Sequence, residues 1–236
     1  MWRYFISIIL IAAGWVCKLQ AQDTIMFPLK FRIGFDVVGA SKYFYDKDKA
    51  NLEVYFSADH SEKLSAIFIA GRSDYTSSRY RDENLMLYDF NAKGLYFKTG
   101  VDLNLLNPKK AAGKYSLGTG FRYGIANYSY NVREINLESY WGRYQTSMSK
   151  NRTWAHYLEA VPAIRAEIIK NISLGWSVSL RKLLSAGTEK DMRPVYLPGY
   201  GNSNSFSFAL NYFIIWNIPN KEKRVVINPK VEPEED

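Results

Sequence analysis

The two histidines are the first residues to consider for chemistry, because a histidine beside a serine and an acid can activate a nucleophile. His60 is flanked directly by an aspartate and a serine, but consecutive side chains point in different directions and do not assemble a triad by themselves. His156 follows Ser147 and Ser149, and nothing fixes the spacing between either hydroxyl and the imidazole. The sequence therefore predicts no catalytic residue and no enzyme. A lipid-modifying enzyme that uses these histidines is the alternative.

Metal and cofactor sites have equally little support among the residues present. Asp46 and Asp48 alternate with lysines, which oppose cation binding. Asp82 with Glu83 lacks the spaced oxygen ligands and the glycine of a calcium loop. Cys17 is the only cysteine, and no glycine-rich phosphate motif is present. We expect neither a metal nor a cofactor.

The other charged residues occupy alternate positions in segments whose remaining positions are large and apolar. Between Ile172 and Leu180 every second residue is apolar, and the residues between them are serine or glycine until Arg181. A period of two predicts a β-strand with one apolar face and one small or polar face. The sequence thus predicts about eight strands, with Pro162 causing a bulge or a local break in one of them. The other segments with this period are 29–37, 52–58, 64–71, 95–104, 115–125, 154–168 and 205–216.

The connections between these segments alternate between short and long. The short ones are 59–63, 105–113 and 169–171, and the long ones are 72–93, 126–153 and 183–202. Outer-membrane barrels have short periplasmic turns and longer extracellular loops. We therefore expect extracellular loops and periplasmic termini.

Aromatic residues, which make up 16% of the chain, are concentrated on the apolar faces of these strands. In a soluble barrel that binds an apolar ligand, the rings would fill the interior, but an eight-stranded barrel is only just wide enough inside for side chains. Glycine, serine and a few ions fit that interior better. The predicted fold is therefore all-β, a closed antiparallel eight-stranded up-and-down transmembrane β-barrel preceded by a signal peptide. The aromatics predicted to face lipid are Phe31, Phe35, Phe97, Phe121, Trp176, Phe206, Phe208, Tyr212 and Trp216.

Charged residues on the opposite faces would then lie in the barrel lumen, where an unpaired ion is costly. Both signs occur, so we expect a salt-bridged plug, with a proton or ion path as the alternative. The residues predicted for this lumen network are Lys30, Arg32, Asp36, Glu53, Lys98, Asp102, Arg122, Glu159, Arg165, Glu167 and Arg181.

The two ends of the chain differ in composition from the strands. Residues 1–21 contain an early arginine, an apolar run and a polar stretch, which is typical of a secretory signal peptide. Residues 22–216 are predicted to form the barrel. Residues 217–236, with charges, prolines and an acidic end, are predicted to be a flexible periplasmic tail. The net charge of +8 favours outer-membrane lipid and lipopolysaccharide as partners, and the exported chain carries no nucleic-acid motif.

The expected outer loops are rich in aromatic residues beside arginines. Exposed rings of this kind could contact protein or glycan, and they could equally fold over the barrel mouth and bury one another. The residues concerned are Tyr128, Tyr130, Tyr140, Trp141, Tyr144, Tyr196 and Tyr200, with Arg133, Arg143 and Arg152 nearby.

Several runs of this sequence together resemble a known family. The runs are LQAQDT, FRIGFDVV, FYDKDKANLEVY, NAKGLYFKTGVDLNL, AHYLEAVPAIRAEIIKNISLGWSVSLRKLL and PVYLPGYGNSNSFSFALNYFIIW. They look like an uncharacterised family of Bacteroidota outer-membrane β-barrel proteins, a porin-like small barrel that forms a domain of unknown function. This resemblance implies an outer-membrane location, an eight-stranded barrel and no particular activity. We therefore expect a non-enzymatic anchoring or accessory component that docks other envelope proteins, such as surface lipoproteins or other barrel proteins.

Overall fold

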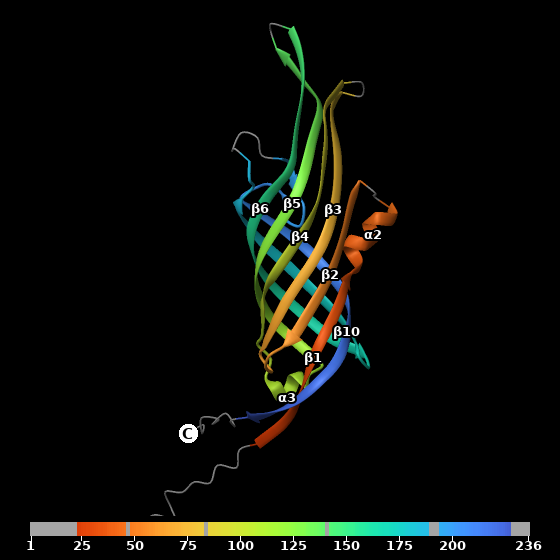
Figure 1. The fold of residues 1–236 in the computed structure, drawn as a ribbon. Coiled ribbons are helices and arrows are strands. Elements are labelled where there is room, and N and C mark those ends of the chain that lie inside the picture. The colour runs from red at the N-terminus through yellow and green to blue at the C-terminus, as the bar shows by residue number, and fades with distance from the viewer. Residues whose placement is uncertain (1–22, 46–47, 83–84, 140–141, 189–193, 228–236) are drawn as a thin grey trace, which may run out of the picture.

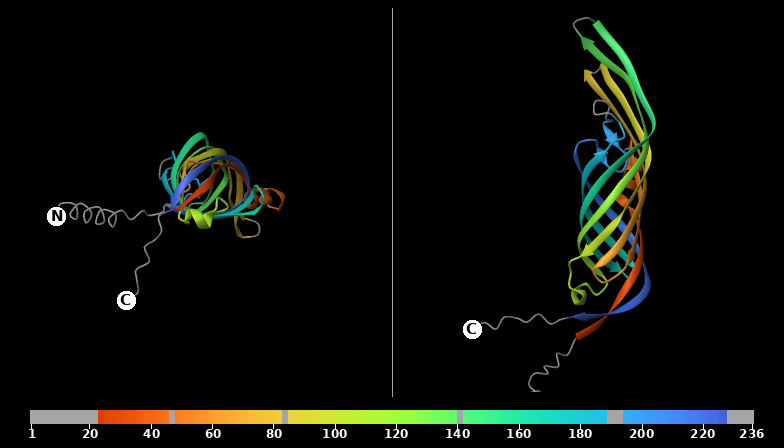
Figure 2. Two further views of the ribbon diagram at one scale, coloured as in Figure 1. Left: turned by 90° about the horizontal axis from the view of Figure 1, so that it is seen from below. Right: turned by 60° about the vertical axis from the view of Figure 1, so that its left-hand side comes forward.

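The computed structural model describes residues 23–45, 48–82, 85–139, 142–188 and 194–227. Eight strands in these ranges pair antiparallel with their neighbours in the chain, and the first pairs with the last to close a barrel (Figure 1). Viewed along its axis, the barrel is a ring of strands (Figure 2). The strands are β1 (Asp23–Asp36), β2 (Lys49–Asp59), β3 (Leu64–Asp82), β4 (Leu85–Asn104), β5 (Tyr115–Ser139), β6 (Gly142–Ile169), β7 (Ile172–Ser185) and β10 (Phe206–Ile227). The predicted all-β, eight-stranded antiparallel barrel is confirmed, and the predicted signal peptide lies outside the described residues.

The strands alternate between exposed apolar and buried polar side chains. In β7, Ile172, Trp176 and Leu180 are exposed, whereas Ser177 and Arg181 are buried. Successive side chains of a strand point to opposite faces, so all the residues of one set lie on one side of the barrel wall. In β7 the apolar set lies outside and the polar set lines the lumen. The lumen also contains a buried apolar cluster, which consists of Tyr55, Ile67, Ile69, Phe213 and Ile215.

Glycines on the inner face leave room for tyrosine rings. A Cβ on Gly71 would overlap the ring of Tyr96, and a Cβ on Gly124 would overlap the ring of Tyr157. Both tyrosines are fully buried. The narrow interior is thus filled by large rings that pack against glycines, which have no side chain.

The hairpins β3–β4 and β5–β6 extend far beyond the other strands at the upper end of the barrel (Figures 1 and 2). Their pairing continues through most of 72–93 and 126–153, so the prediction of long loops at these positions was wrong. The physical reason is packing, because Phe90, Tyr128 and Tyr130 lie on the inner face and contact one another. These rings give the extended ladder a core of its own.

One strand ends earlier than the alternating pattern predicts. The carboxylate of Asp36 accepts hydrogen bonds from the backbone N–H groups of Val38 and Gly39, both at 3.2 Å. This is helix N-capping, and it starts helix α2 (Val37–Tyr45) where the pattern had placed Val37 in the first strand. No helix within the described ranges is long and apolar enough to cross a membrane.

The last strand ends later than the sequence predicts. β10 continues past Trp216 to Ile227 and pairs with the start of β1, from Asp23 to Leu29. The predicted boundary between barrel and tail at 216/217 was therefore wrong, while residues 228–236 lie outside the described residues. The extension is ordered because Val225 and Phe27 pack against the short helix α3 (Pro108–Ala111) between β4 and β5.

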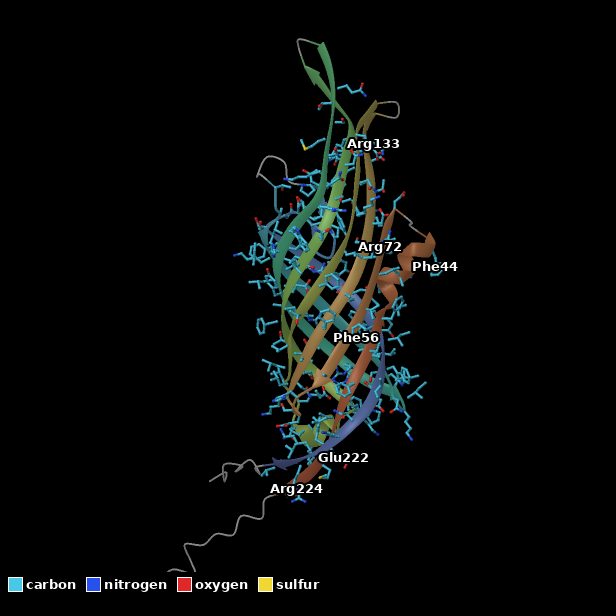
Figure 3. All side chains as sticks on the ribbon, viewed as in Figure 1. Phe44, Phe56, Arg72, Arg133, Glu222 and Arg224 are labelled. Atoms are coloured by element: carbon cyan, nitrogen blue, oxygen red, sulfur yellow. The ribbon has the colours of Figure 1, made fainter. Side chains whose placement is uncertain are left out.

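Exposed apolar side chains form a belt around the barrel wall. Towards the hairpins the belt ends at exposed basic residues, including Arg72 on β3 and Lys93 on β4. Figure 3 shows Phe56 at mid-height, Arg72 above it and Arg133 further up on the extended hairpins. Glu222 lies on the strand extension at the opposite end. The belt therefore covers the middle of the barrel, and polar residues flank it at both ends.

Candidate functional site

The upper lumen contains a four-residue ion cluster centred on Glu159. Its carboxylate lies 2.7 Å from the guanidinium Nε of Arg181 and 3.3 Å from Lys98 Nζ. Lys98 Nζ also donates a 3.1 Å hydrogen bond to Glu53, which accepts a second one, at 2.9 Å, from the Tyr96 hydroxyl. β2, β4, β6 and β7 each supply one of the ions, and all four are buried. The cluster contains two acids and two bases, so its formal charge is zero.

A second ion cluster lies in the lower lumen. Asp59 accepts a 2.6 Å hydrogen bond from Arg32 Nη2 and a 2.7 Å hydrogen bond from the Ser65 hydroxyl. Lys30 Nζ donates to Glu167 at 2.5 Å. Asp59 was predicted to lie in the connection 59–63 and was not predicted as a lumen residue. The signal was available, because Asp59 continues the inward alternation of Glu53, Tyr55 and Ser57 along β2.

The remaining predicted lumen residues lie between and beside these clusters. Arg122 donates a 3.3 Å hydrogen bond to Asp102. Arg165 borders a cavity of about 40 Å³ together with Asp102 and Arg122. Asp36 accepts hydrogen bonds from the Asn211 side chain and the Tyr212 backbone, both at 3.2 Å. Of the eleven residues predicted for the lumen network, eight are buried, and Asp102, Arg165 and Glu167 are half-buried.

The mouth above the upper cluster is filled by the segment between β7 and β10, in residues 194–205. It carries the small hairpin of β8 (Tyr196–Leu197) and β9 (Gly201–Asn202). Arg181 Nη1 donates a 3.0 Å hydrogen bond to the Tyr200 carbonyl, and the Tyr196 hydroxyl lies 3.1 Å from the Ser73 hydroxyl. Leu197 and Tyr200 are fully buried. We call residues 194–205 the mouth plug.

Aromatic rings surround the mouth plug. Tyr196 stacks on Tyr75 at 4.1 Å between centroids, and the Tyr128 hydroxyl donates a 2.7 Å hydrogen bond to the Ala186 carbonyl. Burial raises the pKa of the Tyr128 and Tyr200 phenols above the usual range for tyrosine. Of the aromatic residues predicted for the outer loops, Tyr128, Tyr130 and Tyr200 are buried around the mouth. Tyr140 and Trp141 lie outside the described residues.

The rings predicted to face lipid lie on the outside of the barrel. All of them are exposed except Tyr212, which is half-buried against Trp176 with 5.2 Å between ring centroids. The exposed ones are Phe31, Phe35, Phe97, Phe121, Trp176, Phe206, Phe208 and Trp216.

The histidines are not brought together with a nucleophile and an acid. The Nδ1 atom of His156 lies 2.6 Å from the Tyr123 hydroxyl on the outer wall of the barrel. His60 is exposed in the turn between β2 and β3. Within the part of the chain that the structure describes, no group of three or more metal-ligating side chains is found.

An apolar exterior around an ion-paired interior defines the class of small β-barrels that are built like those of outer membranes. The chain belongs to the family described as Domain of unknown function (DUF6048), which matches residues 1–223. This confirms the predicted membership of a domain of unknown function, and the match does not bear on the bacterial group. No curated protein matches the chain.

Three solved structures are similar to the chain at low sequence identity. The crystal structure of Ail, the attachment invasion locus protein of Yersinia pestis, is 10% identical with a TM-score of 0.38, and the match covers 86% of this chain and 99% of that chain. Acinetobacter baumannii CarO2 is 9% identical with a TM-score of 0.36, covering 83% and 99%. Acinetobacter baumannii CarO is 11% identical with a TM-score of 0.34, covering 83% and 98%. The barrel assignment rests on the strand pairing of this chain itself.

Proposed function

We propose that this chain is a non-enzymatic outer-membrane protein that anchors long β-hairpins at the cell surface, where they dock other envelope proteins. The observation that carries the proposal is a lumen filled by ion pairs and closed by the mouth plug, combined with two paired hairpins that continue beyond the wall. A filled lumen disfavours a conduction path. The surface available for function is then the hairpins.

The belt of exposed apolar residues supports the proposed location in the outer membrane. Rings and aliphatic side chains that would be costly in water are favourable against hydrocarbon, and a closed barrel leaves few unpaired strand edges in lipid. Exposed Arg72 and Lys93 lie where the belt ends towards the hairpins. In an outer membrane with the hairpins outside, these cations meet lipopolysaccharide phosphates.

The hairpins carry two backbone edges that suit a protein partner. β2 begins opposite Tyr75, so β3 beyond that residue has no strand beside it on the β2 side within the described ranges. β7 stops at Ser185, opposite His156, which leaves residues 142–155 of β6 without a β7 partner. Free strand edges bind extended segments by adding a strand to the sheet. Surface lipoproteins or other barrel proteins are the partners we propose.

Shortening the β5–β6 hairpin tests the proposal. The variant lacks residues 132–148 and joins Asn131 to Ser149 through an Asn-Gly turn, which suits a two-residue hairpin. Each lost backbone hydrogen bond to a partner is worth about 1 kcal/mol, so we expect recovery of the partner to fall by at least about tenfold. The measurement is quantitative mass spectrometry after crosslinking in cells and purification through a C-terminal tag.

A second variant shortens the β3–β4 hairpin, which carries the other proposed docking edge, by removing residues 79–88 between the paired Ser78 and Asp89. The edge whose removal lowers partner recovery is the one that binds the partner. Both variants must assemble, which is shown by the heat-dependent gel mobility of a folded barrel. Recovery of the intact barrel with no crosslinked envelope protein would contradict the docking role. Equal partner recovery from the wild type and from a variant lacking both extensions would contradict it as well.

A further inference from the structure

The barrel wall has a gap in its upper half, between β10 and β2. β1 ends at Asp36, which pairs with Phe213, so residues 206–212 of β10 pair only with β7. On the other side of the gap, β2 pairs with β1 only from Val54 to Ala58. The upper part of β2, from Lys49 to Glu53, pairs only with β3. Helix α2, which joins β1 to β2, contacts both edges of this gap (Figure 1).

The edge of β10 presents polar backbone groups towards the gap. The N–H of Tyr212 faces it, because this group donates to the Asp36 carboxylate at 3.2 Å. Backbone groups alternate in direction along a strand, so those of Leu210 and Phe208 face the same way. Their side chains are 75% and 77% exposed on the outer wall. Unpaired backbone groups at membrane depth are costly, so this edge favours a polar partner.

A cavity of about 720 Å³ crosses the wall at the gap. Its lining combines inward residues, such as Glu53 and Arg181, with the outward residues Val178, Phe208 and Leu210. The volume falls within the range of small-molecule sites. The cavity is therefore open to the lipid side and has a polar inner end.

The charges along the cavity are ordered from inside to outside. Asp36 lies at the inner end and is buried with only uncharged hydrogen-bond donors among the described residues. Glu53 and Arg181 also line this end, but their charges are balanced by Lys98 at 3.1 Å and by Glu159 at 2.7 Å. Lys42 of α2 and Lys49 at the start of β2 lie at the outer rim. The inner end thus favours a cation and the rim favours an anion.

An apolar groove continues from the cavity down the outer wall. It has a volume of about 670 Å³ and shares Val38, Val178 and Leu210 with the cavity. Leu117, Ile164, Trp176 and Tyr212 line its floor and are register partners across four adjacent strands. A row of this kind fits a hydrocarbon chain.

We propose that this gap is a lateral lipid-binding site that selects one ethanolamine phospholipid. In the orientation proposed above, the gap lies in the outer leaflet, so this phospholipid binds in competition with lipopolysaccharide. The primary ammonium lies towards Asp36 and the phosphate lies at Lys42 and Lys49. An acyl chain follows the groove past Leu210 and Trp176. An ammonium group donates three hydrogen bonds, which backbone carbonyls of the β10 edge can accept beside the charge of Asp36, whereas a trimethylammonium group has no N–H to donate.

The test is native mass spectrometry of the detergent-purified barrel with four added lipids. These are palmitoyl-oleoyl phosphatidylethanolamine, the matching phosphatidylcholine and phosphatidylglycerol, and lipid A without ethanolamine. We expect one phosphatidylethanolamine per barrel, retained at least about tenfold better than the other three, the factor that one charge-assisted hydrogen bond supplies. Equal retention of the ethanolamine and choline lipids, or stronger retention of phosphatidylglycerol or lipid A, would overturn the proposal.

Two variants test whether the lipid is retained at the gap. Asp36→Asn keeps a side-chain oxygen that can cap α2 but removes the charge that attracts the headgroup, so retention of phosphatidylethanolamine should fall by at least about tenfold. Ala209→Trp fills the cavity and should abolish retention of every lipid at this stoichiometry. Asp102→Asn is the matched control, because it removes a lumen carboxylate that does not line this cavity. Undiminished retention of phosphatidylethanolamine in either Asp36→Asn or Ala209→Trp would refute the site.

Discussion

Replacing Glu159 by alanine is expected to lower the free energy of unfolding by about 3–5 kcal/mol, the cost typical of removing one partner from a buried ion pair. Glu159 is buried and contacts Arg181 and Lys98. After the change, Lys98 keeps its hydrogen bond to Glu53, but Arg181 loses its carboxylate while remaining buried. The measurement is urea unfolding of the barrel in lipid vesicles, followed by tryptophan fluorescence.

A double-mutant cycle separates the ion pair from simple loss of volume. Glu159→Gln keeps the shape of the side chain and removes only the charge. Combined with Arg181→Gln, it should recover part of the loss, because neither partner is then a lone buried charge. If Glu159→Ala unfolds within about 0.5 kcal/mol of the wild type, which is the range of a neutral surface change, the cluster contributes no stability and its burial needs another explanation.

Placing an arginine in the belt is expected to cost about 2–4 kcal/mol when the barrel is folded in lipid vesicles, the range for this residue at mid-membrane. Phe121→Arg is the variant, because Phe121 is exposed on β5 within the belt. Its register partners are Val101 on β4 and Ala160 on β6, and its side chain is 56% exposed, so the substitution removes little buried packing. The free energy of unfolding is measured by refolding and unfolding titrations in urea.

The control for this prediction lies on the same strand and the same face. Asn131 is ten residues further along β5, on the hairpin extension beyond the belt, and Asn131→Arg should change the free energy of unfolding by about 0.5 kcal/mol or less. Extraction of the wild-type protein from membranes without detergent, or equal tolerance of the two arginines, would contradict the membrane assignment and favour a soluble barrel.

The alternation of side chains was sufficient to predict the strand number, the closed barrel and the two faces of its wall. A period of two is a local property, and it persists wherever one face meets water or ions and the other meets lipid. The inward charges were predictable for the same reason. Asp59 was missed only because its position at the end of β2 resembled a turn.

Strand lengths and the wall gap were not predictable from the sequence, because both depend on contacts between distant segments. The extension of β5 requires Tyr128 and Tyr130 to meet Phe90 of β4 across the lumen side of the sheet. The gap exists because Asp36 turns the chain into α2 at a level where β10 continues upward. The local sequence pattern of one strand does not indicate where the strand beside it ends.

The pairing of β1 with β10 also constrains how the protein is made. Asp23, near the start of the described chain, pairs with Ile227, near its end, so the seam of the ring joins the two most distant strands. Contacts of such long sequence separation form slowly. The wall can be sealed only after synthesis of the last strand is complete, and until then both unsealed edges are open to mispairing. The nearly finished chain must therefore be kept from other strand edges until its two ends meet.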